Sequence, residues 1–115
     1  MCILVFVYGT LMKGHTNHHW LQGAQAYGVA QLSGAVLHDL GPFPMAIAGS
    51  GRIHGELYGV DITGLARLDV LEGYPRLYDR QQLLLDGGAR AWVYLGRPNQ
   101  VRHVAAIPSG RWHGH

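Results

Sequence analysis

The sequence predicts an α+β fold in which a curved or barrel-like sheet carries helices on its outside. Six or seven short apolar segments, separated by glycine or proline, have the composition and length of β-strands. Only two segments carry helix signals, and the 17 glycines are spread through the chain, which suits short strands joined by tight turns. We therefore expect one domain over residues 1–115, with a core over about 3–96 and an irregular tail over 98–115.

The first strand is predicted in the apolar run that ends at Val7. An unbroken run of β-branched and aromatic residues is typical of a strand buried on both faces. Gly9 follows almost at once and allows a sharp turn, because glycine takes positive φ freely. Backbone N–H groups just after such a strand can point into a cleft. Residues 8–11 are therefore either a plain turn or a site for an anionic group.

Two helices are predicted along the chain. The first covers residues 18–26 with Asn17 as its N-cap, and the second covers 65–72 and ends at Gly73. The other strands are predicted at residues 27–32, 35–40, 45–48, 52–60, 81–85 and 89–95, with turns at 49–51 and, between the last two strands, at 86–88.

Two further segments lack a regular pattern. Residues 41–44 contain two prolines and predict a rigid loop, because proline fixes its own φ and restricts the residue before it. The closing segment loses periodicity after Pro98, and Trp112 is the residue expected to hold it against the rest of the chain.

The composition excludes several classes of function. The formal net charge is +2, 14% of residues are charged, and no run of Lys or Arg exists, so we expect no nucleic-acid partner. No apolar stretch approaches the roughly 20 residues that span a membrane, so no membrane role is expected. The start lacks the basic region of a signal peptide, and the single cysteine, Cys2, fits a reducing compartment. We expect a cytoplasmic protein.

Glu72 occupies an unusual position in the second predicted helix. The apolar stripe runs from Leu65 through Leu68 and should continue at the seventh residue, which is Glu72, while Arg67 and Asp69 take the outer side. Burial and the negative end of the helix dipole should both raise the pKa of this carboxyl, as a general acid or base requires. The alternative is a carboxylate that reaches water or pairs with a nearby arginine, Arg76 or Arg80.

Other candidate residues carry weaker signals. Glu56 lies in the middle of a predicted strand, where we expect a structural or supporting role rather than catalysis. Cys2 has no activating neighbour and is not expected to be a nucleophile. His15 and His19 have the spacing of a helical metal site, but Asn17 as a cap would divide them between loop and helix, so we expect neither a metal nor another cofactor.

Three segments in this order resemble the γ-glutamylcyclotransferase-like superfamily, in its small AIG2-like bacterial and plant branch. They are Val-Tyr-Gly-Thr-Leu at 7–11, Gly-Glu-Leu-Tyr at 55–58 and Leu-Asp-Val-Leu-Glu-Gly-Tyr-Pro at 68–75, followed by Tyr78 and Arg80. Further similarity comes from Gly14 and Asn17 after the first of these segments, and from residues 40–46 and 91–94. The resemblance covers roughly residues 3–96.

The resemblance implies a small mixed β-barrel with flanking helices and an end cavity lined by Tyr8, Gly9, Thr10 and Leu11. It implies an acyl-transfer reaction that cyclises a γ-glutamyl amide to 5-oxoproline and frees an amine or amino acid. The nucleophile is the substrate's own α-amino group, and Glu72 is the implied catalytic acid and base. Tyr78 would line the pocket, with Glu56 and Arg80 supporting it.

Two alternatives remain open at this point. A non-catalytic module would use the same pocket to bind a small carboxylate-bearing metabolite, although a buried Glu72 beside an anionic ligand does not favour binding alone. A metal-dependent hydrolase would use the histidines and lose activity with a chelator.

Overall fold

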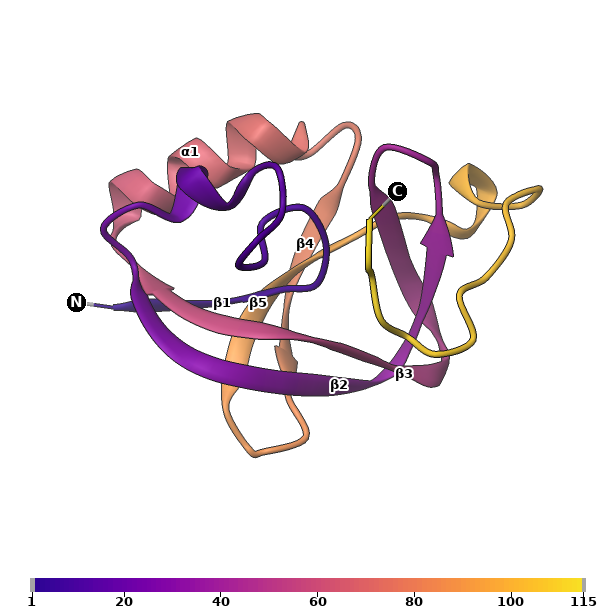
Figure 1. Ribbon diagram of the computed structural model, residues 1–115, viewed down its shortest axis with the longest axis horizontal. Helices are drawn as coiled ribbons and strands as arrows, with labels where there is room; N and C mark the ends of the chain where they lie inside the picture. The colour runs from indigo at the N-terminus through magenta and orange to yellow at the C-terminus, as the bar shows by residue number, and fades with distance from the viewer. Residues whose placement is uncertain (1, 115) are drawn as a thin grey trace.

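The computed structural model describes residues 2–114, which form one five-stranded sheet with helical segments beside it (Figure 1). The strand order is β2-β3-β1-β5-β4. The elements in chain order are β1 (Ile3–Val7), the 3₁₀ helix η1 (His18–Leu21), β2 (Gln25–Asp39), β3 (Pro44–Val60), α1 (Ile62–Glu72), β4 (Asp79–Leu84), β5 (Arg90–Leu95) and the 3₁₀ helix η2 (Pro98–Gln100).

β1 is the central strand, as its apolar sequence predicts. It pairs antiparallel with β3 and parallel with β5, so the sheet is mixed. Val5, Phe6 and Val7 are all buried, with Val5 and Val7 packed in one hydrophobic cluster and Phe6 in another. The strand therefore separates two halves of the core and delivers the residues that follow it into the middle of the molecule.

Two long strands replace four predicted short ones. The predicted strands at 27–32 and 35–40 are both part of β2, where Gly28 and Gly34 take φ of 97° and 88° at two register irregularities. The turn predicted at 49–51 is instead part of β3. A Cβ at Gly51 would lie 2.8 Å from the Ala35 carbonyl oxygen, so this glycine allows a close approach between strands rather than a turn.

The α+β class is confirmed, but the sheet is not closed into a barrel. β2 and β4 lie at its two ends in the strand order. The β4–β5 hairpin is confirmed, with Asp79 opposite Leu95 and Leu84 opposite Arg90. The expected barrel is thus an open, strongly curved sheet.

α1 and the segment after β1 lie on the same side of the sheet (Figure 1). Asp61 caps α1 by accepting a hydrogen bond from the Gly64 N–H at 2.6 Å, and Gly73 ends it in the left-handed conformation. The helix predicted over 18–26 is only the short η1, because Gln25 already pairs with Gly59 of β3. Within residues 2–114, no helix is long and apolar enough to cross a membrane.

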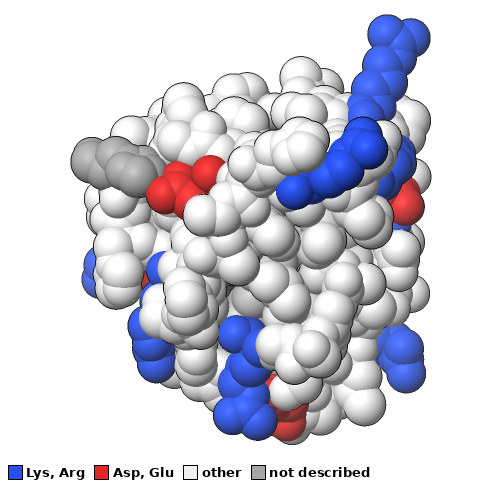
Figure 2. Space-filling view, turned by 90° about the vertical axis from the view of Figure 1, so that its right-hand side faces the viewer, with Lys and Arg blue, Asp and Glu red and all other residues white. Residues whose placement is uncertain are grey.

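The segment after η2 packs against β2 and β3. The Ile107 N–H donates to the Leu37 carbonyl oxygen at 2.7 Å, and the Asp39 N–H donates to Ala105 at 3.2 Å. Trp112 is 5% exposed and belongs to the same core cluster as Phe6. Figure 2 shows the right-hand side of the molecule as seen in Figure 1. On this face, Lys and Arg lie in separate groups over a mainly uncharged surface.

Candidate active site

A cavity of about 110 Å³ lies where β1 and β5 end. Its walls come from the turn after β1, the start of β3, the end of α1, the segment before β4, and β5. The structure brings together six residues that the sequence predicts for the site: Tyr8, Gly9, Thr10, Leu11, Glu72 and Tyr78. The two predicted supporting residues, Glu56 and Arg80, lie outside the cavity lining.

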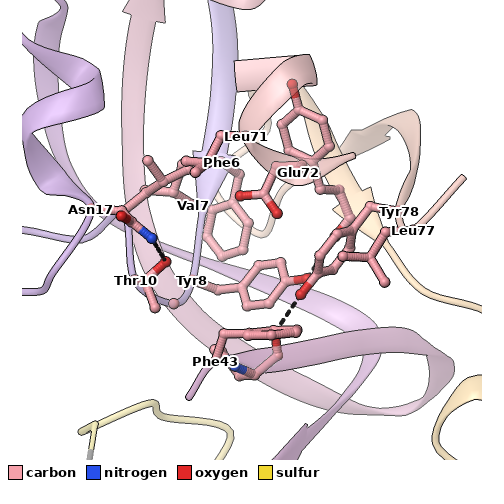
Figure 3. A pocket seen from close by; sticks show the side chains of 14 residues that line it. Phe6, Val7, Tyr8, Thr10, Asn17, Phe43, Leu71, Glu72, Leu77 and Tyr78 are labelled. Carbon is pink, nitrogen blue, oxygen red and sulfur yellow. Dashed lines mark hydrogen bonds between the residues drawn. The ribbon is translucent and has the colours of Figure 1, made fainter. Parts of the chain in front are cut away.

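Glu72 ends α1 and points its carboxylate into the cavity (Figure 3). Burial raises the pKa of this carboxyl from 4.5 to about 7. The sequence left open that Arg76 or Arg80 pairs with this carboxylate. Within residues 2–114, no ion pair joins Glu72 to either arginine. The carboxyl can therefore both accept and donate a proton near neutral pH, and the predicted direction of the pKa shift is confirmed.

The turn at residues 8–11 presents backbone donors to the cavity. In the part of the chain that the structure describes, the N–H groups of Gly9, Thr10 and Leu11 have no protein acceptor. Gly9 is required for a different reason from the one expected, since its φ is not positive. A Cβ at Gly9 would lie 2.6 Å from Cγ of Pro44, so glycine allows the loop at the start of β3 to close over the turn.

Tyr8 and Tyr78 both direct their phenol protons at backbone oxygens. The Tyr8 hydroxyl donates to the Tyr94 carbonyl oxygen at 2.7 Å and accepts from the Ala46 N–H at 3.2 Å. The Tyr78 hydroxyl donates to the Pro44 carbonyl oxygen at 2.7 Å. Burial raises the pKa of both phenols, and the Glu72 carboxylate raises it further, so both stay protonated. Tyr78 keeps oxygen lone pairs with which it can accept a hydrogen bond.

Asp69 anchors the last turns of α1, contrary to the prediction that it faces outward. Its carboxylate accepts hydrogen bonds from Arg80 at 2.8 and 3.1 Å and from the Tyr94 hydroxyl at 2.7 Å. The Arg80 guanidinium lies between two aromatic rings, 4.5 Å from the centroid of Tyr74 and 4.4 Å from that of Trp92. This network fixes the helix end that carries Glu72.

Glu56 holds the segment that follows the turn. Its Oε1 accepts a hydrogen bond from the Lys13 N–H at 2.9 Å and from the Tyr58 hydroxyl at 2.8 Å. This carboxylate therefore ties the segment after residues 8–11 to β3, which is the structural role that the sequence favours.

The histidines that the structure describes do not assemble into a metal centre. Among residues 2–114, no group of three or more His, Cys, Asp or Glu side chains could hold a metal ion. Nδ1 of His18 lies 2.9 Å from the Leu11 carbonyl oxygen, and its ring packs against Tyr58. Cys2 is exposed and outside the cavity lining.

Several lining residues were not predicted for the site. Asn17, expected as a helix cap and part of the resemblance without an assigned role, donates from its side-chain amide to the Thr10 hydroxyl at 3.0 Å (Figure 3). Phe43 and Pro44 come from the predicted rigid loop, and the Tyr94 segment belongs to the resemblance without an assigned role. The two prolines were the available signal for a fixed wall. Asn17 was signalled by capping and by the resemblance, but neither signal placed its side chain in the cavity.

Comparison with known proteins identifies the same family that the sequence motifs resemble, along nearly the whole chain. Residues 5–114 match the family described as gamma-glutamyl cyclotransferase, AIG2-like, so the match also covers most of the tail. The chain is 41% identical over 110 residues to a Vibrio cholerae protein provisionally named a gamma-glutamylcyclotransferase, covering 95% of this chain and 94% of the relative.

Two further relatives extend the comparison. The chain is similar to the gamma-glutamylcyclotransferase family protein YtfP of Escherichia coli, whose solution structure superimposes with a TM-score of 0.75 at 38% identity and 96% coverage of both chains. It is also 40% identical over 99 residues to gamma-glutamylaminecyclotransferase A of Danio rerio, covering 74% of this chain and 60% of the relative.

Proposed function

Since the chain belongs to the gamma-glutamyl cyclotransferase, AIG2-like family of enzymes, we propose that it converts a γ-glutamyl amide into 5-oxoproline and a free amine or amino acid, with Glu72 as acid and base. The observation that carries this proposal is the unpaired Glu72 carboxyl, with a pKa of about 7, in the same cavity as the donors of residues 8–11. A raised carboxyl pKa near the working pH is what a proton carrier needs.

The reaction needs no nucleophile from the protein. The ionised Glu72 removes a proton from the α-ammonium group of the substrate, and the free amine attacks the γ-carbonyl carbon to form the ring C–N bond. The amide C–N bond then breaks. Of the three ammonium protons, one remains on the lactam nitrogen and two pass to the leaving amine, which departs as an ammonium ion. Glu72 carries these protons and ends the cycle ionised.

The other cavity residues hold the glutamyl group in the reactive geometry. The N–H groups of Gly9, Thr10 and Leu11 are fixed donors for negative charge on the substrate, and the Tyr78 oxygen is an acceptor for the ammonium group. A cavity of about 110 Å³ is small beside the roughly 300–1,000 Å³ of drug-sized sites, so it fits the folded glutamyl group and leaves the amine near the mouth. Holding the chain folded removes much of the entropy cost of ring closure.

The decisive experiment measures 5-oxoproline release by mass spectrometry from a panel of γ-glutamyl amines and γ-glutamyl amino acids. We expect release from at least one member, and we expect E72Q to lose at least about a hundredfold in kcat, as removal of a general acid–base does. An unchanged thermal transition in E72Q is the control for folding. Full turnover by E72Q would exclude the proposed role of Glu72.

The pH profile tests the same role independently. With a Glu72 pKa of about 7, the wild-type kcat/KM should rise with pH along an acid limb centred near pH 7, rather than near the ordinary glutamate value of 4.5. A non-catalytic binding module would instead show stabilisation by ligand, about 2.7 kcal/mol at a hundredfold excess over Kd, with no product at any pH.

A further inference from the structure

Asn17 makes hydrogen bonds that its position in the chain does not require. It directly precedes η1, yet its side chain forms no capping bond, and its φ and ψ of −109° and 12° are not those of an ordinary N-cap. The side chain is instead part of the cavity wall. Because the Asn17 side chain does not cap η1, its amide can form a hydrogen bond elsewhere.

Asn17 holds Thr10 through two hydrogen bonds. The Asn17 backbone N–H donates to the Thr10 carbonyl oxygen at 2.8 Å, and the Asn17 side-chain amide donates to Thr10 Oγ1 at 3.0 Å. An amide NH₂ group has no lone pair with which to accept. Oγ1 must therefore be the acceptor in the second bond, and the Thr10 hydroxyl proton is left to donate elsewhere.

No protein group takes that proton within residues 2–114. The half-buried Thr10 lies on the side of the cavity opposite Tyr78 and Leu77, together with the free N–H groups of the turn (Figure 3). The Thr10 hydroxyl and the N–H groups of the turn are therefore donors on this wall, whereas the acceptor Glu72 lies across the cavity. An amino-acid head group, with one anionic and one cationic end, matches this polarity in a single orientation.

We propose that Asn17 is a positioning residue that commits the Thr10 hydroxyl to donate to the carboxylate of the bound ligand. The proposal rests on the proposed function, because it takes the ligand to be a glutamyl or 5-oxoproline group. In this role Asn17 acts through Thr10 rather than through a hydrogen bond of its own to the ligand. Without it, the hydroxyl is free to rotate and to accept, and the wall loses a fixed charge-assisted hydrogen bond.

The test is an NMR titration with 5-oxoproline and with its carboxamide, which is neutral. We expect the wild type to prefer the carboxylate, and N17A and T10V each to weaken 5-oxoproline binding about tenfold, as loss of a hydrogen bond to a charged group does. Carboxamide binding should change little. In the double variant, N17A should add nothing to T10V. The control is N99A, which removes the same amide from Asn99, an exposed residue outside the cavity lining.

Three results would overturn the proposal: equal weakening of both ligands by N17A, a further tenfold loss when N17A is added to T10V, or no carboxylate preference in the wild type. If N17A does not fold, the carboxylate preferences of T10S and T10V are compared instead, since T10S keeps the hydroxyl and T10V lacks it. Equal carboxylate preference in those two variants also overturns it. The titration needs no turnover, so an absence of 5-oxoproline release would count against the proposed function alone.

Discussion

Folding and the proposed catalysis make opposite demands on Glu72. The pKa of its carboxyl is about 7 in the folded protein and 4.5 for the ordinary group, so the folded state binds the proton more tightly. Stability from this residue is fully present below pH 4.5 and is lost as the pH rises through 7. The enzyme therefore keeps, at working pH, a charge that weakens its own fold.

E72Q should consequently be more stable than the wild type at pH 8. The glutamine side chain has no charge to desolvate, so the difference in unfolding free energy should grow from near zero at pH 4 to about 2 kcal/mol at pH 8. This value is below what the full pKa shift implies, because Glu72 is only half-buried and solvent screens it. Urea denaturation at several pH values measures the difference, since Tyr8 and Tyr78, whose pKa values Glu72 raises, stay protonated throughout this pH range. A constant difference across this range would contradict a raised pKa.

The apolar stripe of α1 predicted from sequence alone that Glu72 lies on the buried face of the helix, because a helical period fixes which residues share a face. The same reasoning failed for Asp69, one helical turn earlier. Its burial depends on Arg80 and Tyr94, which reach it from β4 and β5 and which no period within the helix reveals. Local pattern thus predicts which face is buried, whereas the partner of a polar side chain is set by tertiary contacts.

At the scale of elements, the turn after β1 and the start of β3 fit together only because Gly9 has no side chain. Gly9→Ala would place Cβ 2.6 Å from Cγ and 2.8 Å from Cδ of Pro44, and the rigid proline ring cannot yield. The turn must then move. We expect a cost of about 1–3 kcal/mol in stability and about a hundredfold loss in kcat/KM, because the donors shift.

The matched control for this prediction is Gly87→Ala, in the β4–β5 hairpin. A Cβ there meets nothing within 4 Å, so activity and stability should stay at wild-type values. Steady-state kinetics and thermal denaturation measure both variants. Equal behaviour of the two alanines would show that the contact with Pro44 does not fix the turn.

The elements that the sequence misassigned share a cause. Glycines at 34, 49 and 51 separate predicted strands in the linear pattern, yet all three lie within β2 or β3. A glycine that opens a turn and one that allows two strands to approach look alike in sequence. The β4–β5 hairpin was predictable because its turn residues lie between two clear strand patterns and need no distant partner.

At the scale of the whole molecule, the segment after β5 is part of the core. Trp112→Ala should cost about 3–5 kcal/mol in unfolding free energy, since it removes a large side chain that is 5% exposed from the cluster around Phe6. The control is His113→Ala, at the neighbouring exposed position, with an expected change below about 0.5 kcal/mol. Urea denaturation tests both. A wild-type midpoint for Trp112→Ala would mean that the segment packs only loosely.

The bond from the Tyr8 hydroxyl to the Tyr94 carbonyl oxygen joins residues separated by 86 positions in the chain. Contacts of such long sequence separation form late, because the loop between them must first be closed against its entropy. During synthesis, the turn after β1 must wait for β5 before its cavity exists. Recovery of activity after refolding should therefore report the last long-range event, and a partly folded chain has no opportunity to act on substrate.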